Sequence, residues 1–276
     1  MSAVLGSTRH PRVQAVRRLH RRSARAAERR FVVEGPQAVR EALRYGGLTE
    51  LFFTDPDEPL VLEAAGHGVD LVQVDAKVLD ALAETVTPQG LVGTAPLRDV
   101  PLAQALDGTP RLVVVLHEVN DPGNAGTVIR TADAAGADAV VLTAGSVDPH
   151  NGKCVRATAG SLWHLPVVAG APVDEVMAAL RRTGLQVLAT TGGGADDLDD
   201  LLDAGDLTGP TAWLLGTEAH GLPEALVAQA DRAVRVPLHG AAESLNLASA
   251  AAVCLYASAR AQRAARRTPT VSREEG

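Results

Sequence analysis

An arginine and an asparagine, Arg130 and Asn124, lie in the stretch NDPGNAGTVIRTADAAGA at residues 120–137. The apolar run LVVVL at 112–116 precedes them without alternation, which is typical of a strand buried on both faces of a parallel sheet. The sequence DPGN that follows predicts a turn. A guanidinium and an amide are therefore expected where a parallel strand ends, which is the usual place for a ligand in open α/β sheets.

A helix is expected from about 125 to 135, with Asn124 as its N-cap and Gly136 closing it. One face of this helix is apolar and should pack on the sheet; it carries Val128, Ala132 and Ala135. Arg130 lies about 200° around the helix from Val128 and so points away from that face. Taken alone, this stretch is more typical of an ordinary strand–turn–helix unit with a solvated arginine than of a binding site.

A glycine-rich loop follows a predicted strand at Thr190, with the sequence TTGGG. Glycines allow a ligand to approach the backbone closely. The loop has neither the lysine of a phosphate-binding loop nor the spacing of a dinucleotide-binding turn, and the four aspartates within 196–200 would repel phosphate. A loop without function and a loop that binds a neutral or cationic ligand both fit this pattern.

Two more strand ends carry polar groups. The first, LLGTEAHGLP at 214–223, has Gly216 and Gly221 around Glu218, a carboxylate that could orient an arginine or hold a cation. The second, VPLHGAAESLNLA at 236–248, contains Ser244 and Asn246, and Ser244 is expected to cap the last helix. Singly, these features are also compatible with an ordinary loop and an ordinary capped helix.

Several other chemistries are disfavoured by the residues present. The two cysteines suggest neither a disulfide framework nor a zinc site, and are expected to be small buried side chains. The eight histidines show no metal-binding spacing, so no metal is expected. The nucleophile motif G-x-S-x-G is absent, and aromatic residues make up only 3%, which argues against a base-stacking sheet.

Charge is distributed unevenly along the 276 residues. The net charge is −7, yet residues 1–30 hold nine arginines and one acid, Glu28. A basic arm on an acidic body is typical of a protein that contacts phosphates at one place, although a solvated arginine-rich helix gives the same count. There is no secretion signal and no apolar stretch long enough to span a membrane, so we expect a cytoplasmic protein with no membrane partner.

The hydrophobic pattern predicts two α/β regions. In the first, a helix at 11–30 precedes strands and helices that alternate up to 94, with strands at 31–35, 51–53, 71–74 and 89–94 and helices at 36–45, 60–66 and 76–83. In the second, helices separate six strands of a parallel sheet. The strands are expected at 112–116, 139–143, 165–168, 186–191, 211–216 and 233–238, and the helices at 125–135, 153–161, 173–183, 198–204, 223–230 and 244–264. Residues 1–8 and the tail from 266 are expected to be disordered.

Together and in this order, the three polar strand ends resemble one family. Asn124-x5-Arg130, Gly216-Thr217-Glu218-x-x-Gly221-Leu222 and Val236-Pro237-Leu238-x6-Leu245-Asn246 are similar to the three motifs of the SpoU or TrmH branch of the SPOUT methyltransferases. Members of this branch transfer a methyl group from S-adenosylmethionine to a ribose 2′-hydroxyl of RNA. The sequence FVVEGPQAVREAL is similar to the substrate-binding domain that many members carry. Leu238 stands where methionine is usual, and every polar motif position is kept.

The resemblance implies a division of the chain. Residues 1–95 would form a basic arm and an RNA substrate-binding domain with a fold like certain ribosomal proteins, and 96–109 would form a linker. Residues 110–265 would form a methyltransferase domain whose parallel sheet ends in a trefoil knot, followed by a disordered tail at 266–276. General topology rules would have excluded such a knot.

The resemblance also implies the site. Arg130 would be the main catalytic residue, with Asn124, Glu218, Ser244 and Asn246 around it. Gly216, Val236 and Leu245 would contact S-adenosylmethionine, with Leu238 close by, and Thr190 is added as a cofactor contact from its glycine-rich loop. RNA is expected on the arginines of the basic arm, namely Arg17, Arg18, Arg21, Arg22, Arg29 and Arg30.

The expected activity is therefore methylation of a ribose 2′-hydroxyl in RNA, most readily ribosomal RNA, by a homodimer that assembles through the methyltransferase domain. A transfer-RNA methyltransferase and an inactive RNA-binding member of the same fold are the alternatives. A nicotinamide-dependent oxidoreductase is rejected, because the turn after the first parallel strand reads DPGNAG rather than G-x-G-x-x-G.

Overall fold

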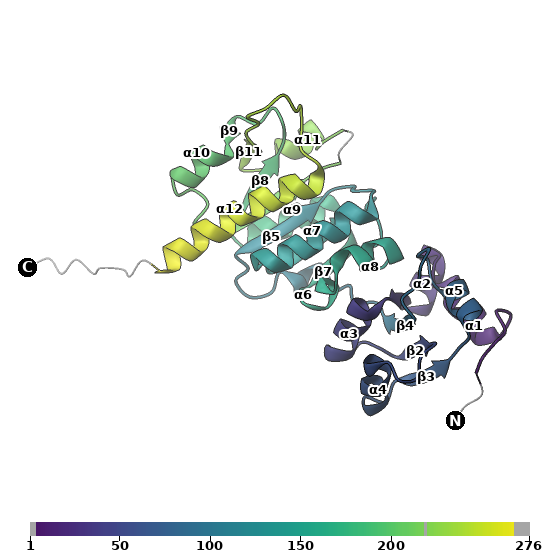
Figure 1. Ribbon diagram of the computed structural model, residues 1–276. Helices are drawn as coiled ribbons and strands as arrows, with labels where there is room; N and C mark the ends of the chain where they lie inside the picture. Colours follow the sequence, from purple (N-terminus) through teal and green to yellow (C-terminus); the bar gives the residue numbers. More distant parts are fainter. Residues whose placement is uncertain (1–3, 218–219, 268–276) are drawn as a thin grey trace, which may run out of the picture. The chain divides into compact units, whose positions relative to one another are not determined.

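Two separate β-sheets organise the chain in the computed structural model, which describes residues 4–217 and 220–267 (Figure 1). Each sheet belongs to its own unit, so the predicted mixed α/β architecture is confirmed. The first unit consists of Met1–Asp99, Asp121–Arg130 and Val147–His164, and the second of Val100–Asn120, Thr131–Ser146 and Leu165–Gly276.

The sheet of the first unit has four strands in the order β1-β4-β2-β3. Their bounds are β1 (Arg30–Glu34), β2 (Glu50–Phe53), β3 (Asp70–Gln73) and β4 (Leu91–Pro96). Strand β4 runs antiparallel to both β1 and β2, whereas β2 and β3 are parallel. The connecting helices are α3 (Pro36–Arg44), α4 (Pro59–Gly66) and α5 (Ala76–Leu82). Each lies within two residues of its expected range, and a proline in the first turn begins α3 and α4.

The arginine-rich N-terminus differs from the single helix expected at 11–30. It forms two helices, α1 (Pro11–Arg18) and α2 (Arg22–Glu28), because the chain turns at Leu19, whose side chain enters the core beside Val13 and Val16. The expected disorder of residues 1–8 is wrong for the part described, since Leu5 donates its backbone N–H to the carbonyl of Gln73. Residues 1–3 lie outside the described residues.

Two later segments pack on the sheet of the first unit. Helix α8 (Gly152–Thr158) and the short 3-10 helix η1 (Ser161–Trp163) follow residue 147. Arg156 of α8 pairs with Glu34 at 2.9 Å, and the ring of Trp163 lies 5.9 Å from the ring of Phe31. This unit therefore joins β1 to segments that come more than 100 residues later in the chain.

The sheet of the second unit has seven parallel strands in the order β7-β6-β5-β10-β8-β11-β9. The bounds are β5 (Leu112–Leu116), β6 (Ala139–Thr143), β7 (Val167–Ala171), β8 (Gln186–Thr190), β9 (Asp196–Asp197), β10 (Thr211–Leu215) and β11 (Arg232–Arg235). Every residue of β5, β6 and β10 is buried, as unalternated apolar runs predict.

Helices separate most of these strands, as expected for parallel connections. They are α6 (Leu102–Ala105), α7 (Pro122–Ala135), α9 (Val173–Arg182), α10 (Leu198–Asp203), α11 (Glu224–Val227) and α12 (Leu247–Arg267). Helix α12, yellow in Figure 1, is the longest of those described. It continues through Arg267, so the disorder expected from residue 266 is wrong at that point, and residues 268–276 lie outside the described residues.

Two strands of this sheet differ from their expected bounds by more than one residue, and a third was not predicted. Strand β11 ends at Arg235 instead of 238, and Pro237, which has no N–H to donate to a ladder, follows two residues later. Strand β7 begins at Val167 instead of 165. The edge strand β9 was not predicted, because aspartates are rare in strands. Its two aspartates pair with Arg232 and Arg235 of the neighbouring strand.

No helix within 4–217 and 220–267 combines the length and apolarity needed to cross a membrane.

Candidate functional site

A pocket opens at the carboxyl ends of three neighbouring parallel strands, β10, β8 and β11, in the second unit. Its volume is about 450 Å³, within the range of small-molecule sites. The lining comes from the loops after these strands and the first turn of α12: Thr190, Thr191, Gly192, Leu215, Gly216, Thr217, Gly221, Val234, Val236, Leu238, Glu243, Ser244, Leu245, Asn246, Leu247 and Ala250. Loops far apart in the sequence thus meet in one concave site.

Glycines let these loops approach one another closely. A Cβ on Gly216 would overlap the carbonyl of Gly221 and lie 2.6 Å from the backbone nitrogen of Leu222. A Cβ on Gly194 would lie 2.6 Å from the backbone nitrogen of Arg235. Because backbone atoms cannot move aside as side-chain ends can, glycine is required at both positions.

All five residues expected to contact the cofactor line this pocket: Thr190, Gly216, Val236, Leu238 and Leu245. Leu238 and Leu245 remain 40% and 38% exposed, so both leave apolar surface at the pocket. The hydroxyl of Thr190 donates to the carbonyl of Leu214 at 3.1 Å, which fixes its orientation beside β10. The pocket thus combines exposed apolar side chains with backbone and hydroxyl groups, as small-molecule sites usually do.

Ser244 and Asn246 line the same pocket, but their structural roles differ from the expectation. Helix α12 begins at Leu247, and the side-chain oxygen of Asn246 accepts from the backbone N–H of Ala248 at 2.9 Å. Asn246 is therefore the cap, and the prediction that Ser244 caps the helix is wrong. The cap fixes Asn246 at the pocket rim, whereas Ser244 lies exposed in the preceding loop.

The start of α7 also differs from the expectation. The helix begins at Pro122, and the carboxylate of Asp121 accepts from the backbone N–H of Asn124 at 2.8 Å. Asp121 is the cap, so the prediction that Asn124 caps this helix is wrong. Lys153 donates to the same carboxylate at 2.7 Å and, with the N–H of Asn124, lowers the pKa of Asp121. Asn124 is half-buried within the first turn.

Arg130 lies on the exposed side of α7, as its position on the helix predicts. The face opposite is buried at Val128, Ala132 and Ala135. The helix closes at Gly136, which has a φ of +76°, with the N–H of Ala137 bonded to the carbonyl of Ala132. Arg130 and Asn124 belong to the first unit and the pocket to the second. Glu218 lies outside the described residues.

Sequence reasoning missed a second hollow beside the first. It has a volume of about 440 Å³, shares Thr217 and Gly221 with the pocket, and is also lined by His117, Glu118, Asn120, His220 and Pro223. Glu118 has a φ of +52°, a left-handed conformation that is uncommon outside glycine. Its N–H donates to the Oγ1 of Thr143, and Gly145 leaves space for its side chain. The signal in the sequence was the position of Glu118, two residues after the end of strand β5.

Neither cysteine is suited to nucleophilic chemistry. Both are buried, and burial raises the pKa of Cys154 and of Cys254 to about 12, so both thiols stay protonated near neutral pH. Over the part of the chain that is described, no group of three or more histidine, cysteine or acidic side chains could hold a metal ion.

The arginines of the N-terminus divide into two classes. Arg17, Arg18, Arg21, Arg22 and Arg29 are exposed, and Arg30 is half-buried. Arg25, by contrast, is buried and donates to Asp148, and Arg12 pairs with Glu50 and Asp70. All six arginines expected to bind RNA thus reach solvent, as does Arg9, whereas Arg12 and Arg25 are held in ion pairs within the unit.

Two protein families match separate ranges of this chain. Residues 111–256 match the SpoU rRNA Methylase family, and residues 10–93 match an MRM3-like substrate binding domain. Over 91% of its length the chain is 34% identical to the 23S rRNA (guanosine(2553)-2'-O)-methyltransferase RlmP of Bacillus subtilis, of which it covers 96%.

Solved structures give the same match over nearly the whole chain. An AdoMet-bound rRNA methyltransferase from Sinorhizobium meliloti aligns with a TM-score of 0.83 and 33% identity over 94% of this chain and 97% of the other. The SpoU methyltransferase AviRb from Streptomyces viridochromogenes, in complex with AdoMet, aligns with a TM-score of 0.79 and 29% identity over 93% of this chain and 99% of the other.

Proposed function

This chain belongs to the SpoU rRNA methylase family, and from that premise we propose that it transfers a methyl group from S-adenosylmethionine to a ribose 2′-hydroxyl of ribosomal RNA. The observation that carries this proposal is the pocket itself. Residues from three separate loops, chosen from the sequence as cofactor contacts, all line one concave site at the ends of β8, β10 and β11.

The pocket fits S-adenosylmethionine in size and in chemistry. Leu215, Val236 and Leu238 offer apolar contact, and the close backbone approach at Gly216 leaves peptide groups at the wall for polar contacts. The carboxylate of Glu243 lies in the same lining and suits the positive charge of the ligand. When bound, the cofactor supplies an electrophilic methyl group on a sulfonium.

Within this proposal, Arg130 holds the phosphate next to the target ribose and stabilises the negative charge that develops on its 2′-oxygen. A guanidinium keeps its proton in proteins, which favours this electrostatic role over that of a general base. Asn124 and Glu218 keep Arg130 in place, and Ser244 and Asn246 position the ribose or the cofactor. Alignment of the hydroxyl with the methyl group in a dry site supplies most of the rate enhancement.

The remaining parts of the chain have roles in substrate binding and assembly. Residues 1–95 bind RNA through the six solvent-exposed and half-buried arginines, 96–109 link the domains, and 110–265 form the knotted methyltransferase domain. Two chains form a homodimer through the first half of α12, where Ser249 and Val253 are exposed. Ribosomal RNA as substrate assigns the enzyme to the cytoplasm.

Replacing the proposed catalytic arginine tests the function. In Arg130→Ala, methyl transfer to a 23S ribosomal RNA transcript should be abolished while affinity for S-adenosylmethionine stays largely unchanged, because the cofactor pocket keeps all its lining residues. Methyl incorporation and calorimetric cofactor binding measure the two quantities. Arg182→Ala, an exposed arginine of α9, is the matched control.

Near-normal turnover of Arg130→Ala would refute the catalytic assignment. The wild-type protein should be assayed on transfer RNA in parallel. Methylation of transfer RNA alone would change the proposed substrate from ribosomal RNA to transfer RNA. Cofactor binding without methylation of either RNA would favour an inactive RNA-binding member of the fold.

A further inference from the structure

The hollow of about 440 Å³ beside the cofactor pocket lies at the ends of strands β5 and β10, entirely within the second unit. From β5 the chain continues through β6 to β7 on one side, and β10 lies on the other side, so the direction of strand addition reverses here. Ligands of open α/β sheets bind outside the strand ends at such a reversal. Because the hollow shares Thr217 and Gly221 with the cofactor pocket, a ligand in one adjoins a ligand in the other.

Glu118 is the residue of this lining with an unusual backbone. Its φ of +52° is a left-handed conformation that glycine adopts with less strain. Neighbouring bonds hold it there: the N–H of His117 donates to the carbonyl of Leu215 at 2.8 Å, and the N–H of Glu118 to the Oγ1 of Thr143 at 3.2 Å. Strain of this kind clusters at functional sites, which points to a use for the glutamate side chain.

The carboxylate of Glu118 is available to a ligand. The residue is exposed, and within 4–217 and 220–267 no ion pair or side-chain hydrogen bond involves its carboxylate. Its side chain lies against Gly145, where a Cβ would come within 3.1 Å of its Cγ. Asn120, also exposed, adds an amide to the same lining. The hollow thus offers one group that only accepts hydrogen bonds and one that both donates and accepts.

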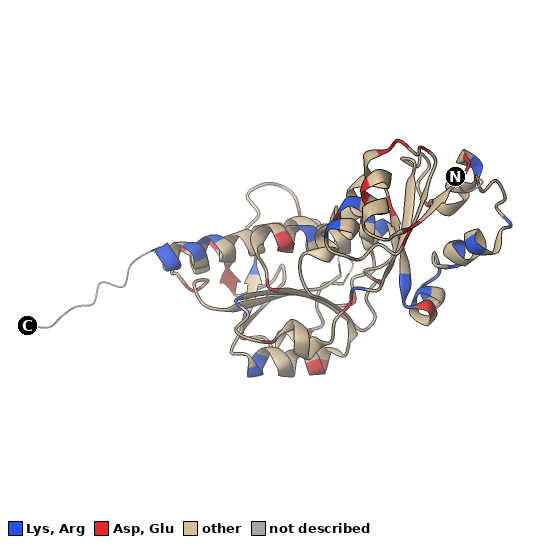
Figure 2. Cartoon of the chain, turned by 90° about the horizontal axis from the view of Figure 1, so that it is seen from below, with Lys and Arg blue, Asp and Glu red and all other residues tan. Residues whose placement is uncertain are grey.

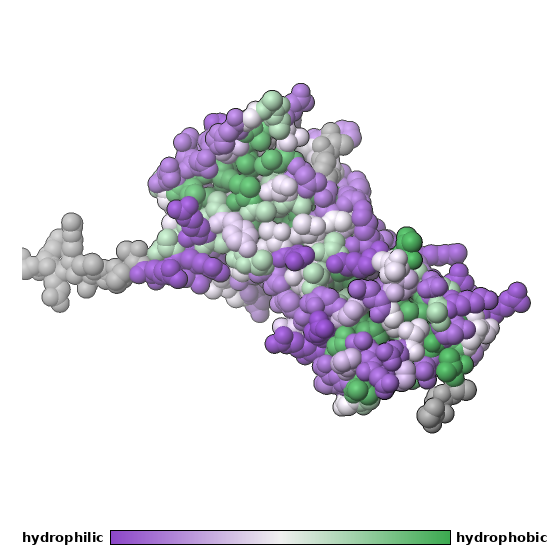
Figure 3. Space-filling view, viewed as in Figure 1, coloured by the Kyte–Doolittle hydropathy of each residue, from purple (hydrophilic) through white to green (hydrophobic). Residues whose placement is uncertain are grey.

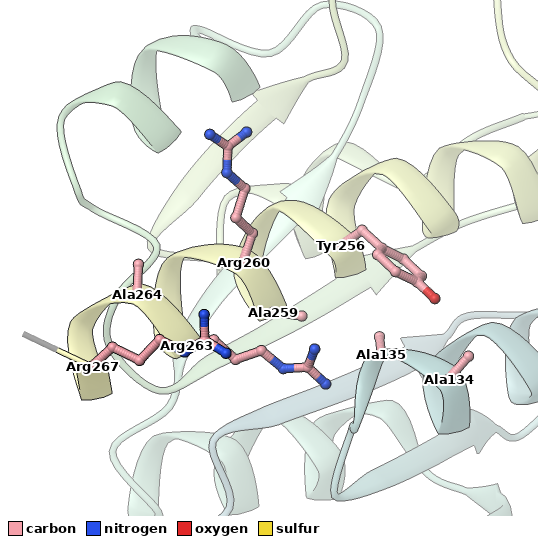
Figure 4. A pocket seen from close by; sticks show the side chains of 8 residues that line it. All are labelled: Ala134, Ala135, Tyr256, Ala259, Arg260, Arg263, Ala264 and Arg267. Carbon is pink, nitrogen blue, oxygen red and sulfur yellow. The ribbon is translucent and has the colours of Figure 1, made fainter.

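Charge separates this hollow from a larger one, of about 540 Å³, which Tyr256 and three arginines line at the end of α12 (Figure 4). Figure 2 shows blue segments at that end of the helix, and Figure 3 shows a hydrophilic surface there. Tyr256 continues the exposed face of Ser249 and Val253, so it belongs to the surface that we assign to the homodimer. The described lining of the hollow beside the cofactor pocket contains no arginine or lysine.

An unpaired carboxylate selects among the parts of an RNA. It repels phosphates, and it accepts hydrogen bonds without donating any. On its Watson–Crick edge, guanine presents two neighbouring donors, N1–H and the 2-amino group, which one carboxylate accepts as a pair. Adenine, cytosine and uracil each present a single donor group on that edge. The O6 of guanine lies next to its two donors and accepts from an amide such as that of Asn120.

We propose that this hollow holds the base of the target nucleotide, that the base is guanine, and that Glu118 and Asn120 read its Watson–Crick edge. The inference rests on the proposed function, since it takes a ribose of RNA as the methyl acceptor. Glu118 is then a specificity-determining residue, whereas Arg130 acts on the phosphate and the ribose.

The first test identifies the methylated nucleoside. A 23S ribosomal RNA transcript is methylated by the full chain, digested to nucleosides and analysed by mass spectrometry, and the product should be 2′-O-methylguanosine. Methylation of adenosine, cytidine or uridine would overturn the inference and leave the proposed function standing. Absence of methylation on any RNA would overturn both.

The second test removes the carboxylate without straining the backbone. Glu118→Gly suits the positive φ, so its thermal stability should equal or exceed that of the wild type. Its kcat/KM for RNA should fall about 10- to 100-fold, as should that of Glu118→Gln, which places a donor where guanine also donates. Cofactor affinity should not change. Glu175→Gln, an exposed glutamate of α9, should behave as wild type.

The third test separates reading of the base from any other role. Inosine lacks the 2-amino group of guanosine, so replacing the target guanosine by inosine should lower kcat/KM of the wild type about tenfold. The same replacement should cost Glu118→Gly little, because the partner of that amino group is already gone. Equal losses in the two proteins would overturn the inference. Weaker cofactor binding by Glu118→Gly would do so too, and would assign the carboxylate to the cofactor.

Discussion

A single buried ion pair shows how individual residues hold the first unit together. The guanidinium of Arg25 donates to Asp148 at 2.7 and 2.8 Å and to the carbonyls of Leu19 and His20 at 2.9 Å. Asp148 also accepts from the backbone N–H of His150 at 2.9 Å. Burial alone would raise the pKa of Asp148, but the bonds from His150 and Arg25 outweigh it, and the pKa lies well below its ordinary value of 3.8.

This lowered pKa makes a prediction about acid stability. A carboxyl whose pKa is depressed in the folded state stabilises the fold above its unfolded pKa, and this contribution is lost as the pH falls through the folded pKa. Asp148→Asn should cost about 3–5 kcal/mol at pH 7, because it leaves Arg25 buried without its partner. Its deficit relative to wild type should shrink as the pH falls below about 4, near the ordinary pKa.

Urea unfolding of both proteins between pH 7 and pH 3 measures that deficit. Asp80→Asn, an exposed carboxylate on α5, should differ little from wild type throughout. A deficit of Asp148→Asn that stays constant down to pH 3 would contradict the linkage.

The same pair marks a limit of sequence reasoning at the residue scale. Nine arginines in residues 1–30 were counted as one basic arm, but Arg12 and Arg25 are structural. Their partners lie 38 or more positions away in the sequence, at Glu50, Asp70 and Asp148. Composition therefore counted as one group arginines that the structure divides into exposed side chains and side chains held in ion pairs.

Among the elements, α7 and α8 pack unusually closely within the first unit, and Gly126 is the reason. A Cβ at this position would overlap the carbonyl oxygen of Cys154 and lie 2.7 Å from the Cβ of Ala157. Helix propensity alone favours alanine over glycine by about 1 kcal/mol. Here the steric term is larger, so Gly126→Ala should destabilise the protein by about 1–3 kcal/mol in thermal or urea unfolding.

Gly66, at the end of α4, provides the opposite case. It is exposed, and nothing lies within 4 Å of the position its Cβ would take. Gly66→Ala should therefore stabilise the protein by about 0.4–1 kcal/mol, because the unfolded chain loses freedom and the folded chain loses no contact. If both substitutions shifted stability in the same direction, the packing argument for Gly126 would fail.

Element boundaries show why some local predictions failed. Asn124 and Ser244 were chosen as caps for their residue type, yet Asp121 and Asn246 cap α7 and α12. Several residues near each helix start can serve as caps, and the choice depends on where the loop places the backbone. The bounds of β5 and β6 were predicted to the residue, because continuous apolar runs bounded by turn residues leave little choice of register.

At the scale of the whole molecule, the family resemblance predicted that the separate loops form one site, which the hydrophobic pattern alone did not predict. Alternating strands and helices predicted a parallel sheet, but its order, with β10 between β5 and β8, depends on chain crossings that periodicity does not encode. The meeting of Thr190, Gly216 and Leu245 in one pocket follows from that order. Nothing in the sequence separated Val147–His164 from the second unit, because its partners on β1 and α3 are distant in the chain.

The inclusion of Val147–His164 in the first unit also decides how RNA binding by the N-terminus should be tested. Deleting residues 1–95 would remove the partners of Asp148, Arg156 and His164 together with the arginines, and would confuse lost RNA contacts with lost folding. Substitutions on the exposed arginines avoid this problem. Arg17 and Arg21 are the most informative, since neither has an ion pair within the described residues.

Arg17→Glu combined with Arg21→Glu in the full chain should weaken RNA binding by roughly tenfold at moderate salt and lower the salt dependence of Kd, because phosphate contacts release bound counterions. Cofactor affinity should not change, since the pocket lies in the second unit. The Arg40→Glu and Arg182→Glu pair, with the same change in net charge, should bind RNA more tightly than this variant. Equal losses in the two double variants would mean that RNA senses net charge alone, and the N-terminal arginines would then have no specific role in binding.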